Sequence, residues 1–300
     1  MHPEALLYSS IMDPYKIQID KSILMYLENF GEKTSLRDAC EYSLMNGGKR
    51  FRPALVLMIA KALGNGIDVS QAAMGIEFFH TASLIADDLP CMDNDDMRRD
   101  KPSVHKKYGE SIALLATYAL ISAGYELLAK NAQTINQSHA ACAGQSDKLC
   151  RLALENVTYN TGILGATGGQ FLDILPPNLT WETLRTIIHK KTITLFEISF
   201  VLGWIFGGGN LSQLPLVKKS AEHFGLAFQI ADDIGDQEQD IKNKRLINVA
   251  NVCGTHQAFE LFHEEIKQFQ LTLNDLQLKS TELHSLINLL DKQTSQLKSN

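Results

Sequence analysis

The stretch from residue 87 to residue 100 reads Asp87-Asp88-Leu89-Pro90-Cys91-Met92-Asp93-Asn94-Asp95-Asp96-Met97-Arg98-Arg99-Asp100. Five carboxylates lie within its first ten positions, and only two arginines follow them. Two carboxylates about 4 Å apart repel each other by roughly 4 kcal/mol at an effective dielectric constant near 20, so this concentration of charge needs a cation. Magnesium takes one or two carboxylates per ion and fills its other positions with water and phosphate oxygens. The stretch therefore predicts a magnesium site that also binds phosphate.

An apolar helix should lead into this stretch. Residues 74–86 are apolar nearly throughout, and Pro90 cannot continue a helix, so we expect the helix to end near Asp88. The chain should then turn back and bring Asp93 towards Asp87. The C-terminal end of a helix carries the negative pole of its dipole, which favours cations. A solvated acidic face is the ordinary alternative for one motif of this kind.

A second acidic cluster lies far downstream, in the segment Gln229-Ile230-Ala231-Asp232-Asp233-Ile234-Gly235-Asp236. Positions 229, 232 or 233, and 236 are three, four and seven residues apart, so they share one face of a helix. Two acidic clusters, each at the end of an apolar helix, could face each other across a cavity and hold metal ions between them. Because there are two clusters, the solvated-face alternative loses most of its weight.

Basic segments elsewhere could hold the phosphate. In Gly47-Gly48-Lys49-Arg50-Phe51-Arg52-Pro53 the glycines let the backbone approach a ligand, and a helix start offers free N–H groups beside basic side chains; an ordinary charged turn is the alternative. Lys190-Lys191-Thr192 stands in an apolar helix, where a basic pair needs an acid, a cavity or a ligand. His80 lies seven residues before Asp87 on the same helical face, which favours a ligand contact over a core role.

The whole chain is predicted to be helical. Helical periodicity runs from end to end, and no series of alternating strand segments stands out. The 300 residues are 45% hydrophobic, enough for a large core, and no linker or repeat divides them. We predict an all-α, single-domain helical bundle over residues 1–300, with a first helix at about 14–30 and a polar insertion at 131–148.

Charge and cysteine usage exclude several classes of protein. The net charge of −6 argues against a nucleic-acid-binding protein, which usually carries a basic surface. The five cysteines show no CxxC pair or metal-ligand spacing, and the N-terminus has no signal-peptide pattern, so we expect a cytoplasmic protein with reduced thiols. No apolar run is expected to reach the roughly 18 to 20 residues of a membrane span.

Together these segments resemble the all-trans short-chain prenyl diphosphate synthases, the polyprenyl synthetase family that includes farnesyl and geranylgeranyl diphosphate synthases, in their bacterial and plastid type. The matching segments are GGKRFRP at 47–53, HTASLIADDLPCMDNDDMRR at 80–99, KPSVHKKYGE at 101–110, GGQFLD at 168–173, KKT at 190–192 and FQIADDIGD at 228–236. The resemblance implies helices around a deep central cavity, a homodimer, and three Mg²⁺ ions per active site.

The resemblance also implies roles for individual residues. Asp87 and Asp93 would bind two magnesium ions and Asp232 the third. The other implied roles are support of these ions by Asp88, Asp233 and Asp236; binding of the allylic diphosphate by Arg98 and Lys191; binding of isopentenyl diphosphate by Lys49, Arg52, His80 and Arg99; and placement of oxygens near the developing allylic cation by Thr192 and Gln229, with Gln170 nearby. Lys191, Thr192 and Gln229 are thus the candidate catalytic residues.

The sequence departs from the family pattern after the second acidic cluster. The segment there is short, which leaves open whether Lys242, Lys244 or neither reaches the allylic diphosphate. Two functions of other classes are also open. A class I terpene cyclase would use the same metal clusters but would not need the second set of basic residues. A non-catalytic partner subunit of a true synthase usually lacks one of the acidic motifs.

Product length should depend on residues below the first acidic cluster. The resemblance implies that the growing chain passes Ser83 and Ala82, which are small, so we expect the floor one turn deeper at Phe78, with Phe79 beside it. A turn advances about 5.4 Å, close to one isoprene unit. This predicts geranylgeranyl diphosphate (C20) as the product, with farnesyl diphosphate (C15) as the alternative if Tyr118 points into the same channel.

Overall fold

The part of the chain that the structure describes, residues 3–136, 144–242 and 248–297 of a computed structural model, is almost entirely helical. In chain order the elements are α1 (Pro3–Leu27), α2 (Ser35–Leu44), α3 (Phe51–Leu63), α4 (Ser70–Asp87), β1 (Met97–Arg98), β2 (Lys101–Pro102), α5 (Val104–Tyr108), α6 (Glu110–Asn136), α7 (Ser146–Thr161), α8 (Ala166–Ile174), α9 (Trp181–Ile188), the π-helix η1 (His189–Ile193), α10 (Thr194–Phe206), the 3₁₀-helix η2 (Leu211–Gln213), α11 (Leu214–Gly235), α12 (Gln237–Lys242), α13 (Val249–Cys253), α14 (Thr255–Asp275) and α15 (Thr281–Leu297). The prediction of an all-α protein is confirmed. Within these ranges the only strands are β1 and β2.

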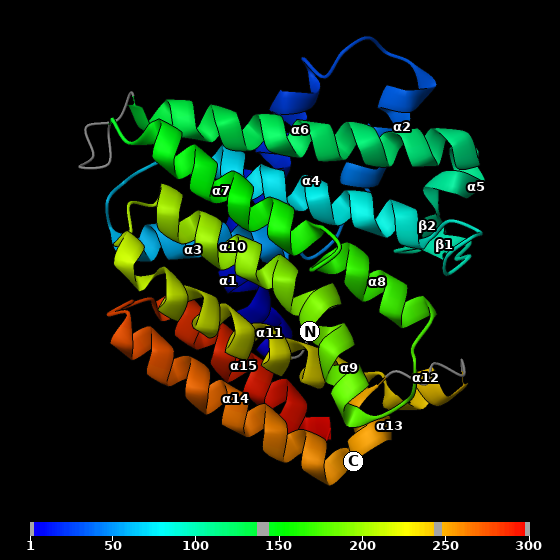
Figure 1. Ribbon diagram of the computed structural model, residues 1–300, viewed down its shortest axis with the longest axis vertical. Helices are drawn as coiled ribbons and strands as arrows, with labels where there is room; N and C mark the ends of the chain where they lie inside the picture. The colour runs from blue at the N-terminus through cyan, green and yellow to red at the C-terminus, as the bar shows by residue number, and fades with distance from the viewer. Residues whose placement is uncertain (1–2, 137–143, 243–247, 298–300) are drawn as a thin grey trace.

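Helix α10 occupies the centre of the bundle because it is apolar on nearly every side. All of its residues are buried except Glu197, and it packs against α3, α4, α7 and α11. In Figure 1 it lies between α7 and α11. A Cβ atom at Gly203 would lie 2.8 Å from the carbonyl oxygen of Val56, so only glycine lets α3 approach α10 this closely. Whether a deep cavity runs through the bundle stays a prediction.

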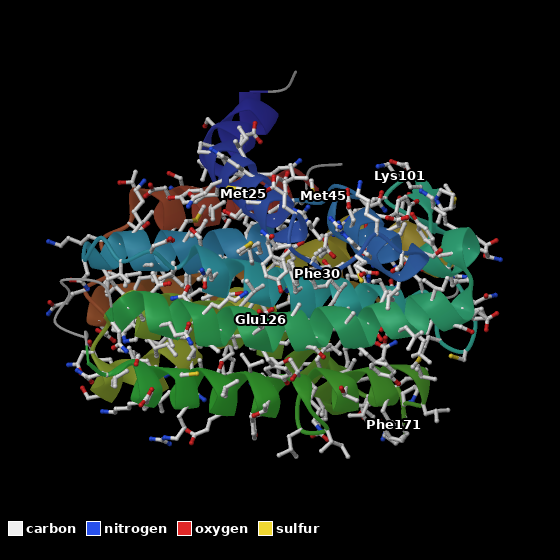
Figure 2. All side chains as sticks on the ribbon, turned by 90° about the horizontal axis from the view of Figure 1, so that it is seen from above. Met25, Phe30, Met45, Lys101, Glu126 and Phe171 are labelled. Atoms are coloured by element: carbon white, nitrogen blue, oxygen red, sulfur yellow. The ribbon has the colours of Figure 1, made fainter. Side chains whose placement is uncertain are left out.

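Two predicted element boundaries were wrong. Helix α1 begins at Pro3 instead of near Pro14, and Figure 2 shows its N-terminal part projecting from the bundle. The polar stretch at 131–148 is not a single insertion, because α6 continues to Asn136 and α7 begins at Ser146. Asn131 is buried, and its side-chain oxygen accepts a hydrogen bond of 2.9 Å from the backbone nitrogen of Ala72 in the first turn of α4. It therefore caps a helix distant in sequence.

Helix α6 also corrects the prediction about membrane spans. Within the described ranges it is the one helix long and apolar enough, by length and composition, to cross a membrane, with a mean hydropathy of 1.6 over 18 residues. It packs along α4 and α2, and 44% of that window is buried. At the front of Figure 2, where Glu126 is labelled, α6 covers the bundle. Packing inside the bundle thus accounts for much of its apolar character.

A buried arginine ties four helices together at one end of the bundle. Arg50, just before α3, has its Nε atom 2.8 Å from Asp20 of α1 and its Nη1 atom 2.6 Å from Glu77 of α4, and its Nη2 atom donates to the carbonyl oxygen of Leu44 at the end of α2. Burial alone would lower the arginine's pKa, but the two carboxylates raise it above the ordinary value. The segment between α2 and α3 is held in place by this charge.

Candidate active site

The turn after α4 forms as the sequence predicts. The helix ends at Asp87, and the backbone nitrogen of Asp93 donates a 2.9 Å hydrogen bond to the carbonyl oxygen of Asp87. The nitrogen of Asn94 donates to the carbonyl oxygen of Leu89 at 3.1 Å, which closes the loop. The expected return of Asp93 to Asp87 is confirmed. Both acidic side chains are therefore carried on one short, hydrogen-bonded loop.

Asp87 lies among charges of both signs. Burial raises the pKa of its carboxyl group to about 6; Lys191 opposes this shift, and the nearby Asp93 adds to it. The ammonium group of Lys191 is hydrogen-bonded to Asp173 of α8, a contact that the sequence did not reveal. Lys191 thus lies between two acidic groups from different helices. A cation is the ligand that would relieve the cost of ionising Asp87.

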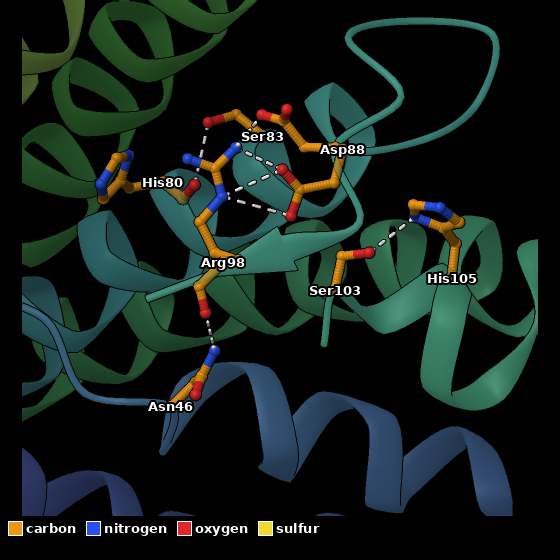
Figure 3. Close-up of polar contacts among 8 residues, drawn as sticks. Asn46, His80, Ser83, Asp88, Arg98, Ser103 and His105 are labelled. Atoms are coloured by element: carbon orange, nitrogen blue, oxygen red, sulfur yellow. Dashed lines mark hydrogen bonds and ion pairs between the residues drawn. The ribbon is translucent and has the colours of Figure 1, made fainter. Parts of the chain in front are cut away.

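Asp88 and Arg98 bind each other in this structure. The Nε atom of Arg98 lies 2.9 and 3.3 Å from the two carboxylate oxygens of Asp88, and its Nη2 atom also contacts Asp88. Figure 3 shows this pair beside Asn46, whose side-chain nitrogen donates to the carbonyl oxygen of Arg98 at 3.0 Å. The arginine that we assign to the allylic diphosphate is thus oriented by Asp88. Asp88 is engaged by Arg98 and is not free to turn towards Asp87 and Asp93 without losing these hydrogen bonds.

A tight hairpin brings Arg99 to the glycine pair. Strands β1 and β2 pair Arg98 with Lys101, and the two residues between them, Arg99 and Asp100, have φ values of 54° and 61°. The Nη1 atom of Arg99 donates to the carbonyl oxygen of Gly47 at 2.5 Å. A Cβ atom at Gly48 would lie 2.5 Å from that Nη1 atom, so any side chain there would displace the guanidinium. The structure therefore joins two basic segments that are distant in sequence.

Arg52 and His80 complete this basic group. The Nη1 atom of Arg52 lies 3.3 Å from the Nε2 atom of His80, and both Nε of Arg52 and Nδ1 of His80 are buried without a hydrogen-bond partner. Burial and the neighbouring arginines hold the pKa of His80 well below its ordinary value, so the imidazole is neutral. Burial lowers the pKa of Arg52 to about 10. Buried polar atoms without partners are costly, which points to an anionic ligand here.

The second acidic cluster divides into an exposed and a buried part. Asp232 and Asp236 are exposed and border, with Lys49, a cavity of about 230 Å³ between α11 and α15. Asp233 is buried, and its carboxylate accepts hydrogen bonds of 2.7 Å from the side chain of Gln229 and from the backbone nitrogen of Val249. Asp233 therefore links α11 to α13. Of the two candidate lysines beyond α11, Lys244 lies outside the described residues.

Lys190 and Lys191 lie in a π-helix that the sequence did not reveal. Residues 189–193 form η1, and a Cβ atom at Gly169 would lie 2.5 Å from the backbone nitrogen of Lys191, so α8 packs directly on this turn. The hydroxyl of Thr192 donates to the side-chain oxygen of Gln229 at 2.9 Å. Gln170 on α8 is half-buried, and its side-chain nitrogen and oxygen are both buried without a hydrogen-bond partner. π-turns are frequent at functional sites because they change which side chains face inwards.

These carboxylates suit magnesium better than a metal ion whose ligands all come from protein side chains. Among the described residues, no three histidine, cysteine or acidic side chains converge on one point. Asp87 and Asp93 come from one loop, and Asp232 and Asp236 from another helix end. Each pair leaves most of an octahedral shell open for water and phosphate oxygens, as Mg²⁺ prefers. The residues present therefore fit the predicted ions, with diphosphate completing their coordination.

The expected floor residue faces away from the acidic loop. Phe78 precedes Asp87 by nine residues, about two and a half turns, so the two lie on opposite sides of α4. Its ring centroid lies 5.4 Å from that of Tyr26 and 6.5 Å from that of Phe30, both outside α4. Tyr118 is 58% exposed on α6 and does not point into this chain's own interior. Phe78 therefore does not lie where the C20 prediction placed it, and Tyr118 does not lie where the C15 alternative needed it.

The all-helical bundle has the fold that solved structures of the isoprenoid synthase class share. The chain belongs to the polyprenyl synthetase family, whose model, described as "Polyprenyl synthetase", matches residues 33–248. It is 37% identical over 234 residues to a heterodimeric geranylgeranyl pyrophosphate synthase large subunit from Arabidopsis thaliana, covering 75% of this chain and 59% of the relative. It is 36% identical over 236 residues to farnesyl diphosphate synthase from Bacillus subtilis, covering 77% and 76%.

The fold agrees with this assignment. A geranyltransferase structure from Legionella pneumophila superposes with a TM-score of 0.81 at 25% identity, covering 97% of this chain and 98% of that one. The structure of an FPP/GFPP synthase from Zymomonas mobilis superposes with a TM-score of 0.80 at 28% identity, covering 96% of this chain and 99% of that one. The chain spans only about six tenths of the length of the first plant relative.

The raised pKa of Asp87 predicts how the stability of the folded protein changes with pH. Because the folded state raises the pKa of Asp87 from 3.8 to about 6, it binds this proton more tightly than the unfolded state. Stability should fall as pH rises through that window, and the penalty should persist above it. Asp87→Asn should therefore increase the free energy of unfolding of the metal-free protein at pH 7.5, and the gain should shrink at pH 4.5.

Urea unfolding in excess chelator measures this effect. Asp13→Asn, at an exposed position on α1, is the control for a lost charge and should change stability little at either pH. A variant Asp87→Asn no more stable than the wild type at pH 7.5 would contradict the electrostatic reading of this site.

Proposed function

We propose that the protein is a magnesium-dependent prenyltransferase that condenses isopentenyl diphosphate with allylic diphosphates, namely dimethylallyl, geranyl and farnesyl diphosphate. The observation that carries this proposal is the presence of two separate groups of cations in one site. Arg98 and Lys191 stand beside the acidic loop. Arg99 lies at Gly48, and Arg52 lies beside His80, near enough to Arg99 for the two charges to interact. One diphosphate would bind at each group, which is what a condensation of two diphosphates requires.

The arrangement accounts for the chemistry in outline. Bound magnesium would neutralise the diphosphate that leaves the allylic carbon. Arg98 and Lys191 would hold the same anion through charge-assisted hydrogen bonds. The oxygens of Thr192 and Gln229 would face the allylic cation, and their mutual hydrogen bond fixes both groups in advance. The isopentenyl double bond would attack C1 of that cation, and the proton lost from its C2 would pass to the released diphosphate.

For product length we propose geranylgeranyl diphosphate, with farnesyl diphosphate as the second candidate. Ala82 and Ser83 leave α4 without a large side chain for the first turn and a half below Asp87. Tyr118, the residue that favoured the shorter product, is exposed. The names of the relatives include both products, so they do not decide between them.

Two other functions are supported less well. A class I terpene cyclase would have no use for the buried, unpartnered atoms of Arg52 and His80, because it ionises one diphosphate only. A non-catalytic partner subunit would have no need of two acidic loops with the charge balance seen around Asp87 and Lys191. Some relatives are described as heterodimeric large subunits, which are paired with a different chain.

Incubation with radiolabelled isopentenyl diphosphate, an allylic primer and Mg²⁺ tests the function directly. We expect a labelled, chain-extended diphosphate whose formation stops in excess chelator. Asp87→Ala should lower turnover about 100-fold or more, since it removes a charge on which leaving-group neutralisation depends. Asp96→Ala is the matched control, because Asp96 is an exposed carboxylate of the same loop and pairs with Lys106. Full activity in chelator would refute the proposal.

A second kinetic prediction separates the two diphosphate sites. Loss of a buried charged donor to a phosphate costs roughly 1.5 to 3 kcal/mol, so Arg52→Ala should raise the KM for isopentenyl diphosphate by about 10- to 100-fold. The KM for the allylic diphosphate should change much less. Arg151→Ala, which removes an exposed arginine paired with Glu155 on α7, is the control. Equal effects on both KM values would show that the cations are divided wrongly.

We further propose that the chain forms a homodimer through α6. Four large apolar side chains on this helix are exposed at spacings of one, three and three residues: Leu114, Leu115, Tyr118 and Ile121. Such an exposed apolar stripe marks an interaction surface. A second copy of this chain is the partner that the family resemblance implies. A related but different subunit is the alternative outcome.

Light scattering after size-exclusion chromatography checks the dimer. Leu115→Arg should give a monomer, because it places a charge at the proposed contact. The matched control is Leu271→Arg on α14, whose leucine is 47% exposed, compared with 50% for Leu115, and lies on another helix. A wild type that is monomeric at micromolar concentration would contradict the proposal.

A further inference from the structure

We propose that Gly124 on α6 sets the depth of the reaction cavity by seating the ring of Phe79, which is the floor on which the growing chain ends. Gly124 would thus be a positioning residue for product length that never touches the substrate. This inference rests on the proposed prenyltransferase function, and it replaces Phe78 with its neighbour. It assigns chain-length control to the contact between α4 and α6.

The helix geometry selects Phe79. Asp87, Ser83 and Phe79 follow one another at intervals of four residues, so they form one stripe along α4 below the acidic loop. The Ser83 hydroxyl donates to the carbonyl oxygen of His80 at 2.8 Å, so it lies back against its own helix. Phe79 is the first large side chain on this stripe, about 12 Å from Asp87 along the axis. Phe78, one position away, turns instead towards the rings of Tyr26 and Phe30.

The Phe79 ring packs against α6 at Gly124, where no side chain projects from that helix. A Cβ atom at Gly124 would lie 2.7, 2.8 and 3.1 Å from three atoms of that ring, and the first two distances are too short for a real side chain. The ring of Tyr125 meets it edge-on, with centroids 5.0 Å apart, and Phe79 is only 4% exposed. The ring therefore occupies the notch that glycine leaves in the surface of α6.

Moving α4 and α6 apart to make room for a side chain at position 124 would disrupt the closely packed interface between them. A Cβ atom at Gly75 would lie 3.3 Å from the carbonyl oxygen of Gly124, so the backbones of α4 and α6 are already in close contact. The two helices also share an extensive interface in the bundle. A methyl group at position 124 would therefore displace the ring rather than the helix. The displaced Phe79 ring would turn away from α6 towards Ser83, and this movement would shorten the space below Asp87.

Product analysis of four variants tests this inference. Gly124→Ala should shift the main product one isoprene unit shorter than that of the wild type. Phe79→Leu, which leaves a smaller side chain, should shift it longer. The double variant should match Phe79→Leu, because the added methyl acts only through the ring. Gly75→Ala is the matched control: its added methyl meets Gly124 and Leu128 in the same helix contact but not Phe79, so its products should be those of the wild type.

Chromatography of the dephosphorylated products gives the readout, with a thermal melt of each variant to compare folding. Unchanged products in Gly124→Ala, or an equal shift in Gly75→Ala, would overturn the inference while leaving the enzyme's function intact. If Gly124→Ala does not fold, the comparison of Phe79→Leu with the double variant decides, and a shorter product in the double variant would overturn it. A wild type that extends no primer would instead refute the proposed function.

Discussion

The site depends first on the buried charge of Arg50. This residue stands between the glycine pair and α3 with φ near 51°, and its guanidinium is shared by Asp20, Glu77 and the end of α2. A buried arginine with one partner removed costs several kcal/mol, so the two carboxylates fix where this segment can lie. Because Glu77 belongs to α4, the same ion pair aligns the basic segment with the helix that carries the acidic loop. The position of the basic segment relative to the acidic loop therefore depends on this ion pair.

Basic and acidic side chains of the site form ion pairs with one another. Arg98 is bound to Asp88 and Lys191 to Asp173, so each cation that we assign to the allylic diphosphate already has an acidic partner on the chain. These ion pairs fix the orientation of Arg98 and Lys191, whose side chains are both partly exposed. By contrast, Nε of Arg52 and Nδ1 of His80 are buried without a hydrogen-bond partner.

Much of the fold and site was predictable because it rests on local patterns. Helical periodicity and the stop imposed by Pro90 both concern residues close together in sequence. The return of Asp93 to Asp87 is a turn of seven residues, and it forms as expected. The bounds of α1 and α6 were missed because a proline inside a helix and a buried asparagine both look like loop residues until a neighbouring helix contacts them.

The sequence by itself determined which charges the protein carries, that its elements are helices, and where the acidic loop turns. Only the tertiary structure decided which of these groups meet across the fold: Arg99 with the carbonyl oxygen of Gly47, Asp173 with Lys191, and Asp233 with the backbone nitrogen of Val249. It also decided that the ring of Phe79, rather than Phe78, packs in the notch at Gly124. The physical reason is that pairing and packing depend on the approach of helices far apart in the chain, and a change of one residue turns a side chain about 100° around its helix.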